Sequence, residues 1–219
     1  LLGNAQTIAA DRGLFLEETW RLHPEICAFT SELFYAGRLH ALDGLDAQRI
    51  GGNTRLSGAR LRYLPVVHAG NQNNSPEEAA AIADLVNEVV AAGVHWTDRE
   101  GRSHPITLDD VLIITPYNAQ VFEIQQRLPG ARIGTVDKFQ GQQAPIAIYS
   151  TATSSHADAP RGMEFLYSLN RFNVATSRAK CISVLVACPE LFEAECRTPR
   201  QMQLANAFCR YLELAEPLA

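Results

Sequence analysis

The alternation of helix-forming stretches with short runs of apolar, often β-branched residues most constrains the fold of this chain. Five runs are expected to be strands, and each is apolar on both faces: 61–67, 111–115, 132–136, 146–151 and 182–187. Strands buried on both faces are typical of parallel sheets that are covered by helices. The pattern therefore predicts an α/β fold with three layers, α/β/α, around a mainly parallel central sheet.

The helices between these strands are predicted from apolar spacing and from end signals. They are expected at about 24–36, 75–93, 121–128 and 198–212. Ser75-Pro76-Glu77-Glu78 has the pattern of a capping box with proline at the first helical position. Thr198 begins a similar pattern. The stretches 36–60 and 152–162 are rich in small and polar residues and are expected to be loops.

Length and composition indicate a domain with a substantial apolar core. The chain has 219 residues, of which 47% are hydrophobic, so residues 1–219 are expected to form one domain. No apolar run approaches the roughly 20 residues of a membrane helix, and no signal peptide is evident, so a cytoplasmic location away from membranes is expected. Because the chain opens with Leu1 rather than Met, we expect it to be a fragment of a longer protein.

Net charge and cysteine spacing argue against two kinds of site, a broad basic surface for nucleic acid and a metal site. The net charge of −5 gives the chain no overall basic field, so any contact with nucleic acid must be local. The five cysteines form no C-x-x-C pair, and the six histidines are scattered, so no metal site is predicted.

Two polar stretches follow predicted strands, where parallel sheets usually bind ligands. Thr115 to Gln120 combines a hydroxyl, an aromatic ring and two amides, which can hold a phosphate and stack a base. Asp137 is expected to cap the connection after strand 132–136. The chain has no G-x-x-x-x-G-K-[ST] stretch, so it cannot cradle a triphosphate by itself.

Four stretches in this order resemble motifs IV to VI of superfamily 1 helicases: Trp20 to Pro24, Thr115 to Tyr117, Gly134 to Gly141 and Asn173 to Ala179. The resemblance points to the branch of nonsense-mediated-decay and Okazaki-fragment-processing helicases, and to bacterial helicases that are fused to RecB-like nucleases. It implies a C-terminal RecA-like domain, which is the second motor domain of an ATP-dependent helicase.

The resemblance implies roles for individual residues in an ATP site that two domains share. Arg21 and Arg178 match catalytic positions, the first reaching the γ-phosphate and the second acting as the arginine finger. Trp20 matches an aromatic residue that stacks on the adenine. Gly141 and Gln143 match a Gly-x-Glu that binds the ribose, with glutamine here in place of glutamate.

Other residues match positions that contact a single strand or link it to the ATP site. The strand contacts are Thr115, Pro116, Tyr117 and Thr135, and the coupling residues are Asp137 and Gln140. The implied partners are single-stranded nucleic acid, with DNA favoured over RNA, a fused RecB-like nuclease, and an N-terminal RecA-like domain. That N-terminal domain would supply the Mg²⁺ ligands for ATP, so this chain alone should have little ATPase activity.

Two alternative functions stay open at the level of sequence. Gln143 in place of glutamate is compatible with a helicase-like scaffold that has lost catalysis. An unrelated Rossmann-like, nucleotide-dependent transferase would need a G-x-G-x-x-G turn, which this sequence lacks.

Overall fold

The centre of the molecule is a six-stranded sheet in which every pair of neighbouring strands is parallel. The computed structural model describes residues 7–8, 11–91 and 93–218. In spatial order the strands are β11 (Glu216–Pro217), β4 (Arg60–Pro65), β10 (Ala179–Ala187), β9 (Ala144–Ser150), β7 (Val111–Thr115) and β8 (Arg132–Thr135). The inner strands β7 and β9 are buried along their whole length, as their continuous apolar sequence predicts.

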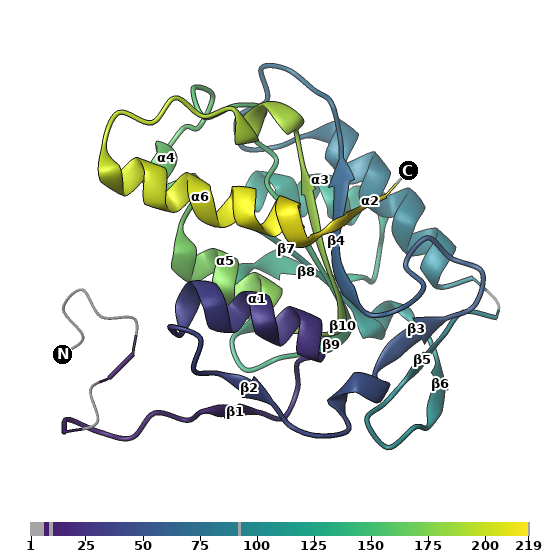
Figure 1. The fold of residues 1–219 in the computed structure, drawn as a ribbon. Helices are drawn as coiled ribbons and strands as arrows, with labels where there is room; N and C mark the ends of the chain where they lie inside the picture. The colour runs from purple at the N-terminus through teal and green to yellow at the C-terminus, as the bar shows by residue number, and fades with distance from the viewer. Residues whose placement is uncertain (1–6, 9–10, 92, 219) are drawn as a thin grey trace.

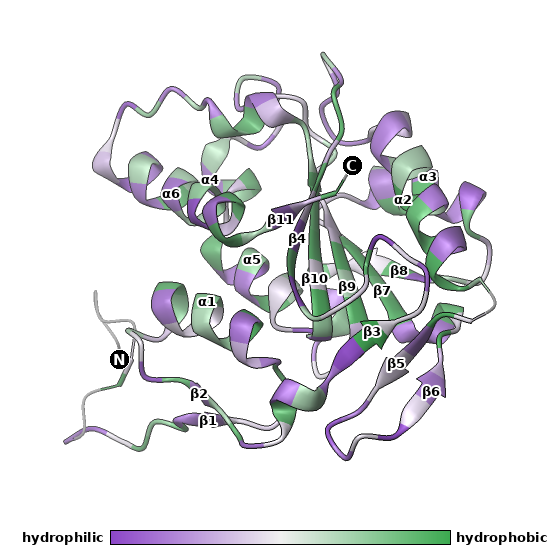
Figure 2. Cartoon of the chain, turned by 45° about the vertical axis from the view of Figure 1, so that its right-hand side comes forward, coloured by the Kyte–Doolittle hydropathy of each residue, from purple (hydrophilic) through white to green (hydrophobic). Residues whose placement is uncertain are grey.

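Helices cover both faces of this sheet (Figure 1). One face carries α1 (Pro24–Phe34), α4 (Met163–Leu166), α5 (Leu169–Thr176) and α6 (Pro199–Leu214), and the other carries α2 (Pro76–Val89) and α3 (Asn118–Arg127). Each face has its own apolar core, and Figure 2 shows the hydrophobic strands between helices whose polar sides face outward. The predicted three-layer, RecA-like α/β/α fold is confirmed.

The α5 helix is fixed firmly in the first of these cores. Phe172 is fully buried, and its ring stacks on Phe208 of α6 with 4.0 Å between ring centroids. Phe172 also contacts Phe29 of α1 at 5.9 Å. Such ring pairs add to the free energy of burial, so α5 is held to both neighbouring helices. None of the helices in the described ranges is long and apolar enough to cross a membrane.

The prediction that 36–60 is a loop was wrong, because two short sheets form there. One pairs β1 (Glu18–Thr19) with β2 (His40–Ala41). The other is antiparallel and joins β3 (Arg49–Gly51) to β5 (His95–Thr97) and β6 (Ser103–Pro105). Four short 3₁₀ helices also occur in the described part: η1 (Leu45–Ala47), η2 (Leu108–Asp110), η3 (Val136–Phe139) and η4 (Pro189–Phe192). Strands of two or three residues give too little periodicity to be recognised from sequence.

The predicted capping box at the start of α2 is half right. Ser75 caps the helix, because its hydroxyl accepts from Glu78 N at 3.0 Å. Glu78 does not reach back to Ser75 N, which donates instead to the Gln120 side chain. The Glu78 carboxylate is completely buried and accepts hydrogen bonds at the carboxyl ends of the strands from His68, Ser150, Thr151 and the backbone N–H of Ala152.

The prediction that 152–162 is a loop is confirmed, and the start of this loop is tied into the same network. Thr153, Ser154 and Ser155 are buried, and the Ser154 hydroxyl lies 2.7 Å from His68 Nδ1. The hydroxyl groups of these small residues thus form hydrogen bonds around a buried carboxylate.

Candidate functional site

Two arginines that are far apart in the sequence lie together at the amino ends of β9 and β10. Arg21 lies in the loop before α1, and Arg178 directly precedes β10. The loop before α1 is tied to β10, since His23 N donates to Lys180 O at 3.1 Å and Gln48 Nε2 donates to Arg21 O at 2.8 Å. We call Arg21 and Arg178, together with Tyr35 and Asn173 beside them, the arginine cluster.

The charges of the arginine cluster are not neutralised by any carboxylate of the described residues. Burial lowers the pKa of the Arg21 guanidinium. Burial lowers the pKa of Arg178 as well, and the positive charge of Arg21 lowers it further. Arg178 Nη1 donates to Gln142 O at 3.3 Å, but its Nε is buried without a hydrogen-bond partner. Two half-buried cations side by side, one with an unsatisfied donor, favour an anion at this place.

The side chain of Arg21 lines an open cavity of about 650 Å³. Trp20, Tyr35, Gln143 and Ser177 line the same cavity. Trp20 is 67% exposed, which is unusual for tryptophan, and the guanidinium carbon of Arg99 lies 5.6 Å from its ring centroid. The cavity offers an aromatic face, an amide and the Arg21 guanidinium, and Arg178 lies close to Arg21; groups of these kinds can bind a purine nucleoside phosphate.

Two members of the arginine cluster were not predicted. Tyr35 ends α1, and its hydroxyl accepts from Asn173 Nδ2 at 3.3 Å, while Asn173 Oδ1 is buried without a partner. Tyr35 lines the same cavity as Arg21, and it raises the pKa of both Arg21 and Arg178 slightly against the effect of burial, so it lies close to both. Asn173 lies within the motif-VI stretch and could have been found there, but nothing in the sequence around Tyr35 marks it.

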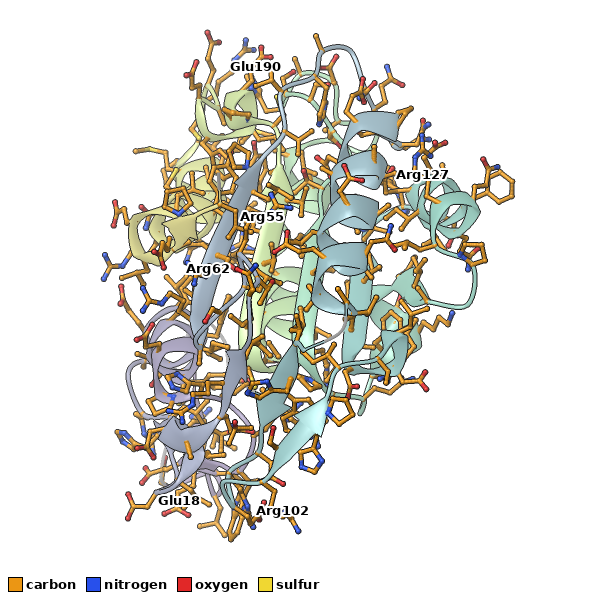
Figure 3. All side chains as sticks on the ribbon, turned by 90° about the vertical axis from the view of Figure 1, so that its right-hand side faces the viewer. Glu18, Arg55, Arg62, Arg102, Arg127 and Glu190 are labelled. Carbon is orange, nitrogen blue, oxygen red and sulfur yellow. The ribbon has the colours of Figure 1, made fainter. Side chains whose placement is uncertain are left out.

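The amino-end position of the arginine cluster differs from the expectation that ligands gather at the carboxyl ends of the strands. Figure 3 shows both ends of the molecule: Glu18 and Arg102 lie at the end of the arginine cluster, and Glu190, which follows β10, lies at the opposite end. The arginines precede their strands, so the general rule for open parallel sheets does not locate them.

The residues expected to touch a single strand are largely covered. Thr115 is 0% exposed, and Pro116 and Tyr117 are also buried. The Tyr117 hydroxyl lies 3.4 Å from Thr153 Oγ1, and its ring packs on Phe165. Thr115 therefore cannot contact nucleic acid in this conformation, because neighbouring loops exclude solvent from it. Thr135 is half-buried at the end of β8.

The stretch after β8 leads from the carboxyl end of that strand back to the amino end of β9. Asp137 is exposed within η3 and does not cap it, so the N-cap prediction was wrong; the cap position is Thr135, which makes no side-chain cap bond. Gln140 is exposed too. Gly141 has a φ of 79°, a conformation that favours glycine, and it turns the chain towards Gln143.

Within the described ranges, no group of three or more His, Cys, Asp or Glu side chains could hold a metal ion.

Comparison with known proteins places the chain in a family. Residues 2–190 match the model of a family described as an AAA domain. The DNA replication ATP-dependent helicase/nuclease JHS1 of Arabidopsis thaliana is 33% identical over 147 residues, covering 65% of this chain and 10% of that protein. The 3'-5' exoribonuclease HELZ2 of Homo sapiens is 27% identical over 205 residues, covering 80% of this chain and 7% of that protein. The chain thus spans a small part of the length of these relatives.

One solved structure is also similar, the C-terminal domain of a "possible DNA helicase" from Lactobacillus plantarum WCFS1. It has 15% sequence identity and a TM-score of 0.43 over 85% of this chain and 94% of that one, a likeness too low to bear on function. The family match over most of the sequence is decisive. The chain belongs to the AAA domain family, which forms the C-terminal region of superfamily 1 helicases.

Proposed function

We propose that this chain is the second motor domain of an ATP-dependent helicase and supplies half of an ATP site. The observation that carries the proposal is the arginine cluster: Arg21 and Arg178 converge at the amino ends of the strands, beside an exposed Trp20, and no carboxylate in the described part of the chain pairs with them. Cations left unpaired and half-buried are costly unless an anion completes the site. A triphosphate held by an adjoining N-terminal RecA-like domain would complete it.

Each residue at this edge would act on ATP in its own way. Arg178 and Arg21 would place planar guanidinium donors against the phosphate charge that builds up during hydrolysis. Trp20 would stack on the adenine, and the Gln143 amide oxygen would accept from the ribose. When bound, ATP with Mg²⁺ supplies the γ-phosphate bond whose hydrolysis drives movement. The Mg²⁺ ligands would come from the N-terminal domain.

The proposed substrate is single-stranded nucleic acid, and DNA is favoured over RNA. Nucleic acid would bind at the carboxyl ends of the strands, where Thr135 and the elements around Tyr117 lie. Asp137 and Gln140 would link this end of the sheet to the ATP site. Among the relatives, JHS1 is named a DNA replication helicase/nuclease and HELZ2 an exoribonuclease, so a nuclease fused to this chain is also part of the proposal.

The test replaces Arg178 in the full-length protein. Arg178→Ala should lower the rate of nucleic-acid-stimulated ATP hydrolysis about a thousand-fold, because an arginine finger acts mainly on the transition state. Binding of a fluorescent ATP analogue should persist. Arg178→Lys should recover little, since lysine keeps the charge but lacks the planar fork.

Arg210→Ala is the matched control, because Arg210 pairs on the surface with Glu32 and Glu213. It should hydrolyse ATP like the unmodified protein. An Arg178→Ala protein that hydrolyses ATP at the normal rate would refute the proposal.

Of the two alternative functions, the transferase is ruled out by the family match, and the inactive scaffold can be tested. The unrelated Rossmann-like transferase is wrong, because the AAA domain family covers residues 2–190. A helicase-like scaffold without catalysis would show no stimulated hydrolysis in the unmodified full-length protein. Gln143→Glu would then be the variant to examine for restored turnover.

A further inference from the structure

A second group of arginines without an ion-pair partner among the described residues lies near the carboxyl ends of the strands, away from the arginine cluster. The guanidinium carbons of Arg161 and Arg171 lie 4.1 Å and 4.2 Å from the centroid of the same Phe165 ring. Phe165 belongs to α4 and Arg171 to the first turn of α5. The centroid of the Phe165 ring lies 5.5 Å from that of Tyr117, which is two residues after the end of β7. We call Arg161, Phe165 and Arg171 the stacked patch.

The stacked patch is positively charged and open to solvent. Arg161 is exposed, Arg171 and Phe165 are half-buried, and no carboxylate of the described residues forms an ion pair with either arginine. Elsewhere in the described chain, eight other arginines do have such partners: Arg38, Arg55, Arg60, Arg62, Arg99, Arg102, Arg127 and Arg210. On a chain with a net charge of −5, two unpaired cations on one ring form a local basic site.

The stacking itself prepares these arginines for a phosphate ligand. A guanidinium that lies on a ring face leaves its in-plane N–H donors free to form a fork with phosphate oxygens. The ring also limits the rotamers of two long side chains before a ligand arrives, which lowers the entropy lost on binding.

We propose that the stacked patch binds the sugar-phosphate backbone of single-stranded nucleic acid, in place of the buried Thr115. The inference rests on the proposed helicase function and assigns the strand contact to residues that no motif indicated. Backbone contacts suit a motor that must hold every sequence alike. Tyr117 then acts behind the surface, by supporting Phe165 from the core side.

The test measures binding of fluorescent oligothymidine to the full-length protein at several salt concentrations. Loss of two phosphate contacts in the variant Arg161→Gln/Arg171→Gln should reduce the slope of log K against log salt by about 1.4, which corresponds to about 25-fold weaker binding at about 0.1 M salt. Phe165→Leu keeps both charges but removes the ring, so it should weaken binding with little change in slope.

The matched control is Arg60→Gln/Arg210→Gln, which removes two charges that are already paired with carboxylates. It should change the slope by much less. Equal slopes for the two double variants would overturn the inference, because the effect would then reflect net charge alone. Failure of this inference would be distinguishable from failure of the proposed function, since the effect of Arg178→Ala on ATP hydrolysis does not depend on the stacked patch.

Discussion

Removal of the buried Glu78 carboxylate should destabilise the chain more than any other single change at the start of α2. Oε2 accepts from Ser150 Oγ at 2.6 Å and from Ala152 N at 3.0 Å, and Oε1 accepts from His68 Nε2 and Thr151 Oγ1, both at 3.1 Å. Ser and Thr hydroxyls can turn towards other acceptors. The backbone N–H of Ala152 cannot turn towards another acceptor, and the ring of His68 can do so only by rotating as a whole.

The magnitude follows from those two donors. A buried donor without a partner costs about 1–3 kcal/mol, so Glu78→Ala should lower the free energy of unfolding by about 4 kcal/mol from the two donors alone. Glu78→Gln keeps an acceptor for Ala152 N and can turn its amide towards His68, so it should lose only the charge-assisted part, about 1–2 kcal/mol. Ala152 adds to the effect, because its φ of 64° is held in place by this bond.

Urea unfolding of the chain, followed by circular dichroism, gives the comparison. The control is Glu77→Ala, one residue earlier in the same helical turn, where an exposed carboxylate accepts from the Asn71 and Ser75 side chains. It should cost less than about 1 kcal/mol. If Glu78→Ala and Glu77→Ala destabilise equally, the buried network does not stabilise the fold in the way argued.

Three further predictions concern other parts of the molecule. Tyr35→Phe should lower the rate of ATP hydrolysis by the full-length protein several-fold with little change in its melting temperature, because it removes the acceptor of the Asn173 amide beside Arg21 and Arg178. Burial raises the pKa of Cys181 to about 12 from an ordinary 9.0. The neutral thiol therefore contributes to stability below pH 9, and this contribution is lost as the pH rises towards 12. Cys181→Ala should make the unfolding free energy fall less steeply between pH 9 and pH 12, as measured by urea unfolding at each pH. Gly52→Ala should lower the free energy of unfolding in urea by at least ~1 kcal/mol more than Gly130→Ala does. Both glycines have a positive φ, but of the two only a Cβ at position 52 would meet a backbone atom, Gly93 O at 2.6 Å.

The parts of the fold that were predictable are those decided by local sequence. Strand β7 matches its predicted range, because four consecutive apolar residues followed by β-branched Thr115 favour a strand that is buried on both faces of a sheet. Helices α2 and α6 begin where Ser75 and Thr198 cap them. In contrast, Glu78 has the spacing of a capping residue, and only the approach of β9 makes it a buried hydrogen-bond acceptor.

Site residues were predictable only where a motif marked them. Nothing in periodicity or composition brings Arg21 near Arg178; resemblance suggested it, and the bond between His23 N and Lys180 O shows how the chain achieves it. Tyr35 and the stacked patch carry no motif. Their roles depend on the positions of α1, α4 and α5 relative to the sheet, which are set by packing of side chains distant in sequence.

The α5 helix connects the stacked patch directly to the arginine cluster. Arg171 stands in its first turn, in the stacked patch, and Arg178 follows two residues after its end, in the arginine cluster. Eight residues span about 12 Å of helix, too short to bend appreciably. Because the helix is rigid and packs through Phe172 on α1 and α6, a displacement of its first turn on nucleic-acid binding would move Arg178 together with α1 and α6. On the proposed function, nucleic-acid binding and ATP hydrolysis are therefore coupled through one rigid element as well as through the exposed residues Asp137 and Gln140.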